Sequence, residues 1–269
     1  MTTLVKFGGE LLEPPARRRA LAGVLAAAAV PLVVVHGGGR EIDAALDRAG
    51  IAKRQVDGLR VTDGPTMQVV VEVLAGAVNT QLVAAIAAAG GRPVGLTGAD
   101  AGLVIVERAA AHRAVDGTVV DLGLVGQPLG QGRPALLDDL VAAGYLPVVC
   151  SIAMSGDGTL FNVNADTLAG HLAARLRVSR LVIAGATAGV LDEAGRTIPH
   201  LDVAQARALV GAGVASAGMI AKLRACCEAL AAGVREVVLV DGREANTIAS
   251  LLSAAAVGSD DLPATRMVA

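Results

Sequence analysis

Residues 31–50 read PLVVVHGGGREIDAALDRAG, a β-branched run that ends at three glycines and is followed by a stretch of mixed polarity. The run 31–36 has the composition of a buried strand. The stretch 40–50 carries apolar residues at positions 42, 45, 46 and 49, which is the spacing of one helix face, and Gly50 is a typical helix stop. The segment therefore predicts a strand, a glycine turn and a helix in succession.

The same alternation recurs along nearly the whole chain. We expect further strands at 3–7, 92–97, 146–150, 179–184, 235–240 and 265–268, and helices at 16–29, 65–89, 135–143, 165–176, 203–211, 218–232 and 246–254. Residues 102–133 break the rhythm and favour antiparallel ribbons and turns. Strands that alternate with helices predict parallel βαβ units, so the expected fold class is α/β, with an open sheet covered on both faces.

The composition excludes several classes of protein. The chain has 269 residues, enough for a buried core, and is 54% apolar with one Tyr, two Phe and no Trp. A formal net charge of −2 and the shortage of aromatic side chains argue against a nucleic-acid partner. Three cysteines, two of them adjacent, make no disulfide framework, so we expect reduced, mostly buried thiols in a cytoplasmic protein.

One stretch near the N-terminus needs a separate interpretation. Residues 17–30, RRRALAGVLAAAAV, superficially resemble the charged and apolar parts of a signal peptide. They follow a strand and a glycine turn, however, and the apolar run is too short to cross a bilayer and is broken by Pro31. We therefore predict an ordinary amphipathic helix, no targeting segment and no membrane partner.

Three glycine clusters follow predicted strands: KFGG (6–9), HGGGR (36–40) and GLTGAD (95–100). In an open parallel sheet, ligands bind beyond the carboxyl ends of the strands, where glycine allows close approach and helix N-termini favour anions. Such turns suggest a polyanionic ligand such as a nucleotide. A Walker-type P-loop is excluded because its sequence is missing, and the G-x-G-x-x-G spacing is missing too. For any single glycine run, a tight βα turn is an equally good interpretation.

Two lysines are conspicuous in a chain with 20 arginines and three lysines. Lys6 stands between apolar neighbours at the end of the first strand, before two glycines, which favours phosphate recognition over a surface role. Lys222 lies beside the apolar seam of a predicted helix, where a compact ammonium group can be required and a planar guanidinium does not fit. Lys53 is interpreted as an ordinary surface residue, and chance could have left lysines anywhere.

Other polar side chains allow two interpretations. Asn164 can cap the helix that follows it, and Asp166 can complement that helix's dipole. Asn162 is left without such an explanation; if the helix begins near residue 163, Asn162 and Asp166 lie on the same side, one turn apart. Arg60, between apolar neighbours, is either a binder of carboxylate or a solvated loop residue. His36 is a candidate only for a structural role in the second turn.

The chain resembles the amino acid kinase family, and the resemblance runs nearly end to end. It is carried by seven motifs in order: VKFGG (5–9), VVHGGG (34–39), GLRVTD (58–63), LAGAVN (74–79), GYLPVV (144–149), FNVNAD (161–166) and AGMIAK (217–222). Each motif alone is weak, but together they are highly specific. The resemblance is greatest to the branch of the family that phosphorylates N-acetyl-L-glutamate in the second step of arginine biosynthesis.

This resemblance implies that ATP donates its γ-phosphoryl group to the γ-carboxylate of N-acetyl-L-glutamate. Lys6 and Lys222 would be catalytic by stabilising the transferring phosphoryl group, and Asp166 would hold both lysines. The implied acceptor-binding residues are Gly38, Gly39, Arg60 and Asn162. Gly8 and Gly9 would present N–H groups to the phosphates. Such chemistry needs positioning and charge stabilisation, and an ionised carboxylate needs no general base.

The implied nucleotide contacts extend to the second half of the chain. They are Gly8, Gly9, Ala186, Thr187, Ala188, Gly189, Val190, Leu191, Val214, Ala215 and Ser216. The family loop usually reads S/T-D-V-x-G, whereas this chain has GATAGVL (185–191), so Ala186 replaces the aspartate. The family pattern GTR is ATR (264–266) here. Mg²⁺ would enter with ATP, held mainly by phosphate oxygens, and no residue is assigned as a metal ligand.

The implied fold is a three-layer α/β/α sandwich with a mainly parallel open sheet, formed by a single domain over residues 1–269. Residues 1–177 would form the N-terminal lobe that binds the acceptor, and 178–269 the lobe that binds ATP. The ribbon 102–133 would belong to a lid over the acceptor. A homodimer formed through the N-terminal lobe is expected. Because the chain starts at its first strand, we also expect that arginine inhibits the enzyme weakly or not at all.

Two other functions stay open at this stage. One is a kinase for a carrier-linked aminoadipate or glutamate in lysine or ornithine biosynthesis; Arg60 and the complete NVNAD sequence (162–166) favour the free acetylated substrate instead. The other is a nucleotide-binding relative without turnover. Retention of Lys6, Lys222 and Asp166 argues against that possibility.

Overall fold

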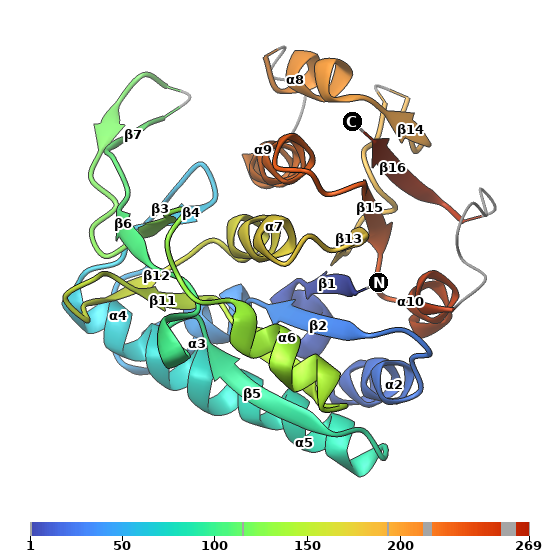
Figure 1. Ribbon diagram of the computed structural model, residues 1–269. Coiled ribbons are helices and arrows are strands. Elements are labelled where there is room, and N and C mark those ends of the chain that lie inside the picture. The colour runs from blue at the N-terminus through green and yellow to red at the C-terminus, as the bar shows by residue number, and fades with distance from the viewer. Residues whose placement is uncertain (1, 115, 193, 212–216, 254–261, 269) are drawn as a thin grey trace.

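The computed structural model describes residues 2–114, 116–192, 194–211, 217–253 and 262–268. Within these residues, eight strands form the central sheet: β1 (Thr3–Phe7), β2 (Leu32–His36), β5 (Pro93–Thr97), β10 (Leu146–Cys150), β13 (Arg180–Gly185), β14 (His200–Leu201), β15 (Glu236–Asp241) and β16 (Ala264–Val268). Their order is β14-β16-β15-β13-β1-β2-β10-β5 (Figure 1). Pairing is parallel except between β15 and β16. The predicted mainly parallel sheet is confirmed.

Helices cover both faces of the sheet (Figure 1). One face packs against α1 (Gly9–Leu12), α2 (Pro15–Ala26), α3 (Gly39–Arg48), α4 (Gly64–Val71), α5 (Asn79–Ala88) and α10 (Ala245–Leu252). The other packs against α6 (Ala135–Ala142), α7 (Ala165–Arg175), α8 (Val203–Gly211) and α9 (Ala217–Ala231). The sheet strands send alternate side chains to the two cores: Leu4 belongs to the second core, and Val5 to the first. This arrangement is the expected three-layer α/β/α sandwich.

The long apolar helix expected at 65–89 contains a wider turn. Between α4 and α5, the segment η1 (Glu72–Val78) is a π-helix, so the helical stretch Gly64–Ala88 is continuous but changes its winding. By length and composition alone this stretch could cross a membrane. Its inward side chains pack in the core below the sheet, as the core helix of a globular protein does.

Short antiparallel ribbons lie beyond the carboxyl ends of the central strands. They pair β3 (Gln55–Val56) with β4 (Leu59–Arg60), β6 (Val106–Arg108) with β9 (Gly126–Pro128), β7 (His112–Arg113) with β8 (Val119–Val120), and β11 (Ile152–Met154) with β12 (Leu160–Asn162). A one-turn 3₁₀ helix, η2 (Asp100–Gly102), precedes β6. His112 Nε2 lies 2.7 Å from Asp57 Oδ2, which ties the β7–β8 ribbon to the β3–β4 turn. The predicted ribbons within 102–133 are confirmed.

One detail of the sequence-based expectation changes. The helix expected at 165–176 is α7, and it begins at Ala165, not near residue 163, because the Asn164 side chain caps it by accepting from the N–H groups of Asp166 and Thr167. Asn162 is therefore a strand residue of β12 and not a helix neighbour of Asp166. The three cysteines are free and buried, as expected.

Candidate active site

Two glycine turns meet at the carboxyl ends of the adjacent strands β1 and β2. A Cβ atom added at Gly9 would stand 2.7 Å from the Cα of Gly38, so the turns touch and Gly9 has no room for a side chain. Each turn leads into a helix, α1 or α3. Within the described part of the chain, the N–H groups of Gly9, Gly38 and Gly39 donate to no protein acceptor, whereas Gly8 N–H donates to Ala184 O at 3.1 Å. Three adjacent N–H groups are therefore available to an anion.

The two conspicuous lysines converge on one carboxylate. Lys6 Nζ lies 2.7 Å from Asp166 Oδ1 as an ion pair without hydrogen-bond geometry, and Lys222 Nζ donates to Asp166 Oδ2 at 2.9 Å. Strand β1, helix α7 and helix α9 each supply one of these residues. Lys6 and Asp166 are buried, whereas the Lys222 side chain is 21% exposed. Among these three residues the positive charge exceeds the negative by one, and the nearby Glu10 carboxylate attracts both ammonium groups.

The protonation states follow from burial and from the mutual attraction of these groups. Burial lowers the pKa of Lys6 below the ordinary lysine value, although Asp166 opposes this effect. Burial would raise the pKa of Asp166, but the charges of Lys6 and Lys222 outweigh it, and the pKa falls below the usual aspartate value. Asp166 is therefore ionised at neutral pH and holds the two ammonium groups side by side.

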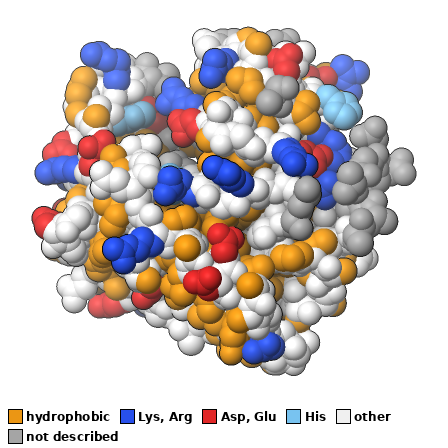
Figure 2. Space-filling model, viewed as in Figure 1, with side chains coloured by type: hydrophobic (Ala, Val, Ile, Leu, Met, Phe, Trp, Pro, Cys, Tyr) orange, Lys and Arg blue, Asp and Glu red, His pale blue; other side chains and the backbone are white. Residues whose placement is uncertain are grey.

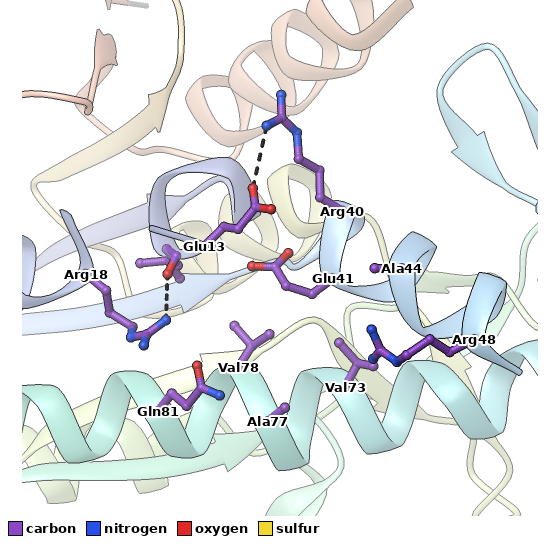
Figure 3. A pocket seen from close by; sticks show the side chains of 11 residues that line it. Glu13, Arg18, Arg40, Glu41, Ala44, Arg48, Val73, Ala77, Val78 and Gln81 are labelled. Atoms are coloured by element: carbon purple, nitrogen blue, oxygen red, sulfur yellow. Dashed lines mark hydrogen bonds and ion pairs between the residues drawn. The ribbon is translucent and has the colours of Figure 1, made fainter. Parts of the chain in front are cut away.

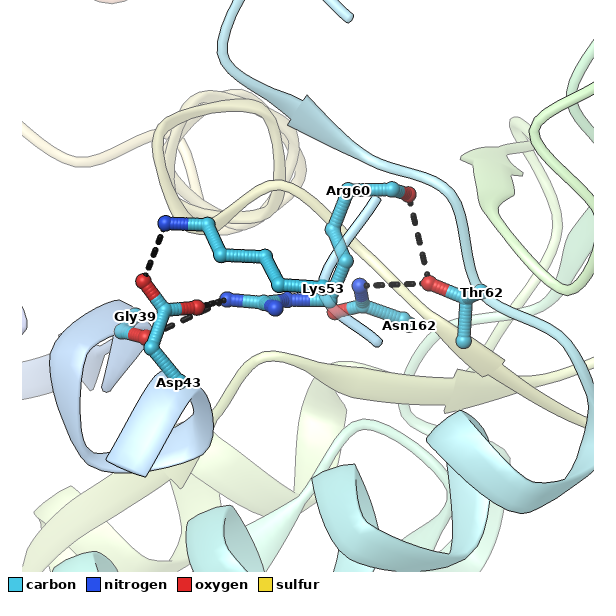
Figure 4. Close-up of polar contacts among 6 residues, drawn as sticks. All are labelled: Gly39, Asp43, Lys53, Arg60, Thr62 and Asn162. Atoms are coloured by element: carbon cyan, nitrogen blue, oxygen red, sulfur yellow. Dashed lines mark hydrogen bonds and ion pairs between the residues drawn. The ribbon is translucent and has the colours of Figure 1, made fainter. Parts of the chain in front are cut away.

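Arg60 is buried and paired, so the interpretation as a solvated loop residue is wrong. Its Nη2 donates to Asp43 Oδ1 at 2.5 Å and to Gly39 O at 3.2 Å, while Lys53 Nζ donates to Asp43 Oδ2 (Figure 4). Among the described residues, no acceptor faces the buried Nη1 of Arg60. A buried guanidinium group with one unpartnered nitrogen, which carries two N–H donors, is suited to bind a carboxylate.

Sequence reasoning missed Asp43, and it found Lys53 to be a surface residue without finding its partner. Asp43 lies on α3 directly after the buried Ile42, at the edge of that helix's core face, which was the available signal. Its pairing with Arg60 and Lys53 depends on the β3–β4 ribbon folding back over α3, which no local pattern reveals. Lys53 is 41% exposed in its side chain, yet it forms the outer end of this charged row.

A cavity of about 210 Å³ extends from Lys6 and Asp166 to Arg60. Its walls include both glycine turns, Lys6, Arg60, Asn162 and Asp166. Asn162 donates from Nδ2 to Thr62 Oγ1 at 3.2 Å, which fixes the amide at the cavity wall (Figure 4). Figure 2 shows this side of the molecule hollowed between the β7–β8 ribbon and helix α8. The third glycine cluster, 95–100, does not line this cavity.

The loop after β13 forms a second part of the candidate site. Ala186 and Thr187 are exposed at the carboxyl end of β13, whereas Val190 is packed in the core. Thr265, from the ATR sequence, holds the loop: its hydroxyl accepts from Val190 N–H at 2.8 Å and donates to Ile198 O at 2.7 Å. Ala188, Gly189 and Leu191 complete the loop, and Val214, Ala215 and Ser216 lie outside the described residues.

A separate cavity of about 250 Å³ lies behind the second glycine turn, between α2, α3 and η1 (Figure 3). Glu41 points into it, and its Oε2 is buried with no hydrogen-bond partner among the described residues. Burial raises the pKa of this carboxyl group. Arg18 is engaged by Leu12 O, and Arg40 by Glu13. None of the residues predicted from sequence lines this cavity, so the candidate active site is the cavity that holds Lys6 and Asp166.

Two ammonium groups on one carboxylate, beside free glycine N–H groups at the carboxyl edge of a parallel sheet, define a phosphotransferase of the α/β class. The chain belongs to the amino acid kinase family, whose family model matches residues 1–241.

Curated relatives are similar over most of their length. Acetylglutamate kinase of Afipia carboxidovorans is 40% identical over 255 residues, covering 92% of this chain and 86% of the relative. Acetylglutamate kinase of Caulobacter sp. is 42% identical over 259 residues, covering 90% and 84%.

Solved structures share the fold. N-acetylglutamate synthase from Neisseria gonorrhoeae, complexed with coenzyme A and N-acetyl-glutamate, matches with a TM-score of 0.81 at 21% identity, over 100% of this chain and 59% of that one. Giardia carbamate kinase matches with a TM-score of 0.68 at 15% identity, over 99% and 98%.

Proposed function

We propose that this chain transfers the γ-phosphoryl group of ATP to the γ-carboxylate of N-acetyl-L-glutamate, the second step of arginine biosynthesis. The observation that carries the proposal is the meeting of Lys6 and Lys222 on Asp166, at one end of a cavity whose wall includes Arg60. The acetylglutamate kinases that are 40% identical over nine-tenths of the chain support the choice of acceptor.

In the proposed reaction, a carboxylate oxygen of the acceptor attacks the γ-phosphorus as the bond between that phosphorus and the β–γ bridging oxygen breaks. The products are an acyl phosphate and ADP. Lys6 and Lys222 neutralise the charge spread over the transferring group, and Asp166 keeps the two ammonium groups together despite their repulsion. The free N–H groups of Gly9, Gly38 and Gly39 supply further donors at the same place. The nucleophile is already ionised, so no general base takes part.

The acceptor is positioned from the opposite wall of the cavity. Arg60 binds its α-carboxylate through the free Nη1, while Asp43 holds the rest of the guanidinium group. Asn162, fixed by Thr62, contacts the acceptor from β12. These contacts select an acceptor with a free α-carboxylate.

ATP fits the other side, where the loop 186–191 is open at the carboxyl end of β13. Exposed Ala186 and Thr187 leave room for a nucleotide, and the missing aspartate at 186 makes backbone groups the main contacts of this loop. Gly8 and Gly9 line the cavity toward the phosphates. Mg²⁺ would enter with ATP, held mainly by the phosphate oxygens, and would neutralise part of their charge.

The same proposal covers the organisation of the chain. Residues 1–177 bind the acceptor and 178–269 bind ATP, within one continuous sheet. The protein works in the cytoplasm, as a homodimer.

The test is a purified-enzyme assay that couples ADP release to each candidate acceptor in turn. N-acetyl-L-glutamate is expected to support turnover with far higher kcat/KM than glutamate or aminoadipate, and hydroxylamine should trap the acyl phosphate. If the enzyme prefers a carrier-linked acceptor, that acceptor replaces N-acetyl-L-glutamate as the proposed substrate. If none of the acceptors supports ADP release, the kinase assignment is wrong.

A further inference from the structure

A buried chain of hydrogen bonds runs from the long helix to the second glycine turn. Asn79, the first residue of α5, donates from Nδ2 to Val148 O at 2.9 Å, and the same nitrogen lies 3.0 Å from His36 Nε2. At the other side of the ring, His36 Nδ1 lies 3.0 Å from Gly37 O. His36 is fully buried, and Asn79 is 5% exposed.

The direction of every bond in this chain is determined by its two ends. Val148 O can only accept, so the amide nitrogen of Asn79 faces it and uses one of its two N–H groups there. The second N–H group donates to His36 Nε2, which must therefore be unprotonated. The ring proton is on Nδ1 and is donated to Gly37 O, which again can only accept. Burial lowers the pKa of His36 to about 4, so the ring stays neutral at physiological pH.

This series of hydrogen bonds determines which way the Gly37–Gly38 peptide group of the turn faces. The Gly37–Gly38 peptide is trans, so its C=O and its N–H point in opposite directions. Because Gly37 O is held toward the buried imidazole, Gly38 N–H points away from it, on the side of the cavity that the turn lines. We propose that Asn79 and His36 are positioning residues that aim the Gly38 N–H at the reacting carboxylate or phosphoryl oxygen. This inference rests on the proposed function for the identity of that oxygen.

Two further features are explained by the same arrangement. A Cβ atom at Gly95 would stand 2.2 Å from Asn79 Oδ1, so glycine at 95 is required for Asn79 to reach the sheet and not for a ligand to approach. The π-helix η1 ends directly before Asn79, and such wide turns often occur at functional sites. The motifs VVHGGG and LAGAVN therefore act together across 43 positions of the sequence.

The first test measures the tautomer directly. In ¹⁵N-labelled protein, two-bond N–H correlations distinguish Nδ1–H from Nε2–H imidazole, and His36 is assigned among the four histidines by comparison with His36→Gln. We expect the Nδ1–H form at neutral pH. An Nε2–H or protonated His36 would overturn the proposal, whatever acceptor the enzyme uses.

The second test uses Asn79→Leu, which removes both donors, with the exposed Gln81→Leu on the same helix as the matched control. Asn79→Leu should change the His36 tautomer signals, shift the Gly38 amide resonance and lower kcat/KM for the acceptor about tenfold or more, with a smaller change in the KM for ATP. Gln81→Leu should change none of these. Folding is checked by circular dichroism, and Asn79→Ser replaces the leucine variant if that variant fails to fold.

A folded Asn79 variant with a normal Gly38 resonance and normal kcat/KM would refute the positioning role. The structural readouts do not depend on turnover, so they separate this failure from failure of the proposed function. If no acceptor supports turnover, the tautomer and the Gly38 resonance still decide whether the hydrogen-bond chain orients the turn.

Discussion

Lys6, Asp166 and Lys222 form a cluster in which a single carboxylate offsets two ammonium groups. A buried lysine is costly without a partner, and sharing Asp166 leaves both ammonium groups charged but only partly neutralised. The two ammonium groups together have six N–H donors, more than the roughly four hydrogen bonds that the Asp166 carboxylate can accept. The surplus of charge and donors is what a phosphoryl group can use, so the same contacts that stabilise the fold prepare the site.

The substitution Lys222→Arg tests whether a point charge is needed at this position. The larger planar guanidinium group cannot occupy the ammonium position beside Lys6, so we expect kcat to fall about 100-fold or more with the fold retained. The measurement is steady-state ADP release together with thermal melting. Arg224→Lys, two residues along the same helix and exposed, is the control and should be unaffected. Near-normal turnover of Lys222→Arg would refute the assigned role.

The substitution Asp166→Asn tests the stabilising role of the carboxylate. It leaves buried Lys6 without its counter-charge, so the free energy of unfolding should fall by about 3–5 kcal/mol, measured by urea denaturation. The exposed pair Asp192–Arg196 provides the control, since Asp192→Asn should hardly move the midpoint. Equal midpoints for Asp166→Asn and the parent would show that Lys6 needs no partner, contrary to its buried position.

At the scale of single residues, the sequence identified side chains by their type but not by their partners. Lys222 stood out because this chain otherwise uses arginine, and Asn164 stood out as a helix cap, which the structure confirms. Asp43 did not stand out, because an acidic residue on a helix is ordinary until the β3–β4 ribbon brings Arg60 and Lys53 to it. Partners that are distant in the chain leave no local signal.

At the scale of elements, strands and helices were predictable from periodicity, while their contacts were not. The alternation of β-branched runs with Ala-rich amphipathic stretches indicated the parallel sheet. The π-helical winding of 72–78 could not be predicted, and neither could the contacts that Asn79, directly after it, makes with His36 and Val148 across the core. Glycine at 95 was likewise interpreted as a ligand turn, whereas a contact between helix and sheet requires it.

The contact between the two glycine turns gives a prediction at this scale. Gly9→Ala places a methyl group 2.7 Å from the backbone of Gly38, which must move the turn after β1 or the turn after β2. We expect a lower melting temperature and loss of most activity. Gly23→Ala, inside α2 with no atom within 4 Å, is the control and should stabilise the protein by about 0.5–1 kcal/mol. Retained activity in Gly9→Ala would mean that the turns can separate without cost.

At the scale of the whole molecule, the central sheet joins residues that the sequence separates widely. Strand β1 lies between β2 and β13, so Lys6 at its carboxyl end is next to both the second glycine turn and the loop 186–191. Helices α7 and α9 pack on one face and bring Asp166 and Lys222 to the same edge. The resemblance of motifs could indicate this convergence. Spacing along the chain could not, because the order of strands in the sheet depends on pairing between distant segments.

The protonation states across the site predict the pH dependence of turnover. Asp166 has a lowered pKa and stays ionised, His36 has a pKa of about 4 and stays neutral, and the acceptor carboxylate is ionised, so no group that the reaction needs changes charge between about pH 6 and 8. Lys6 must be protonated, and burial lowers its pKa, so kcat/KM should fall on the alkaline side, below the ordinary lysine value of 10.5. With saturating magnesium and excess coupling enzymes, we expect a plateau near neutrality and a single alkaline limb. An acid limb near pH 6.5 would instead reveal a histidine acting as a general base, and the mechanism would need revision.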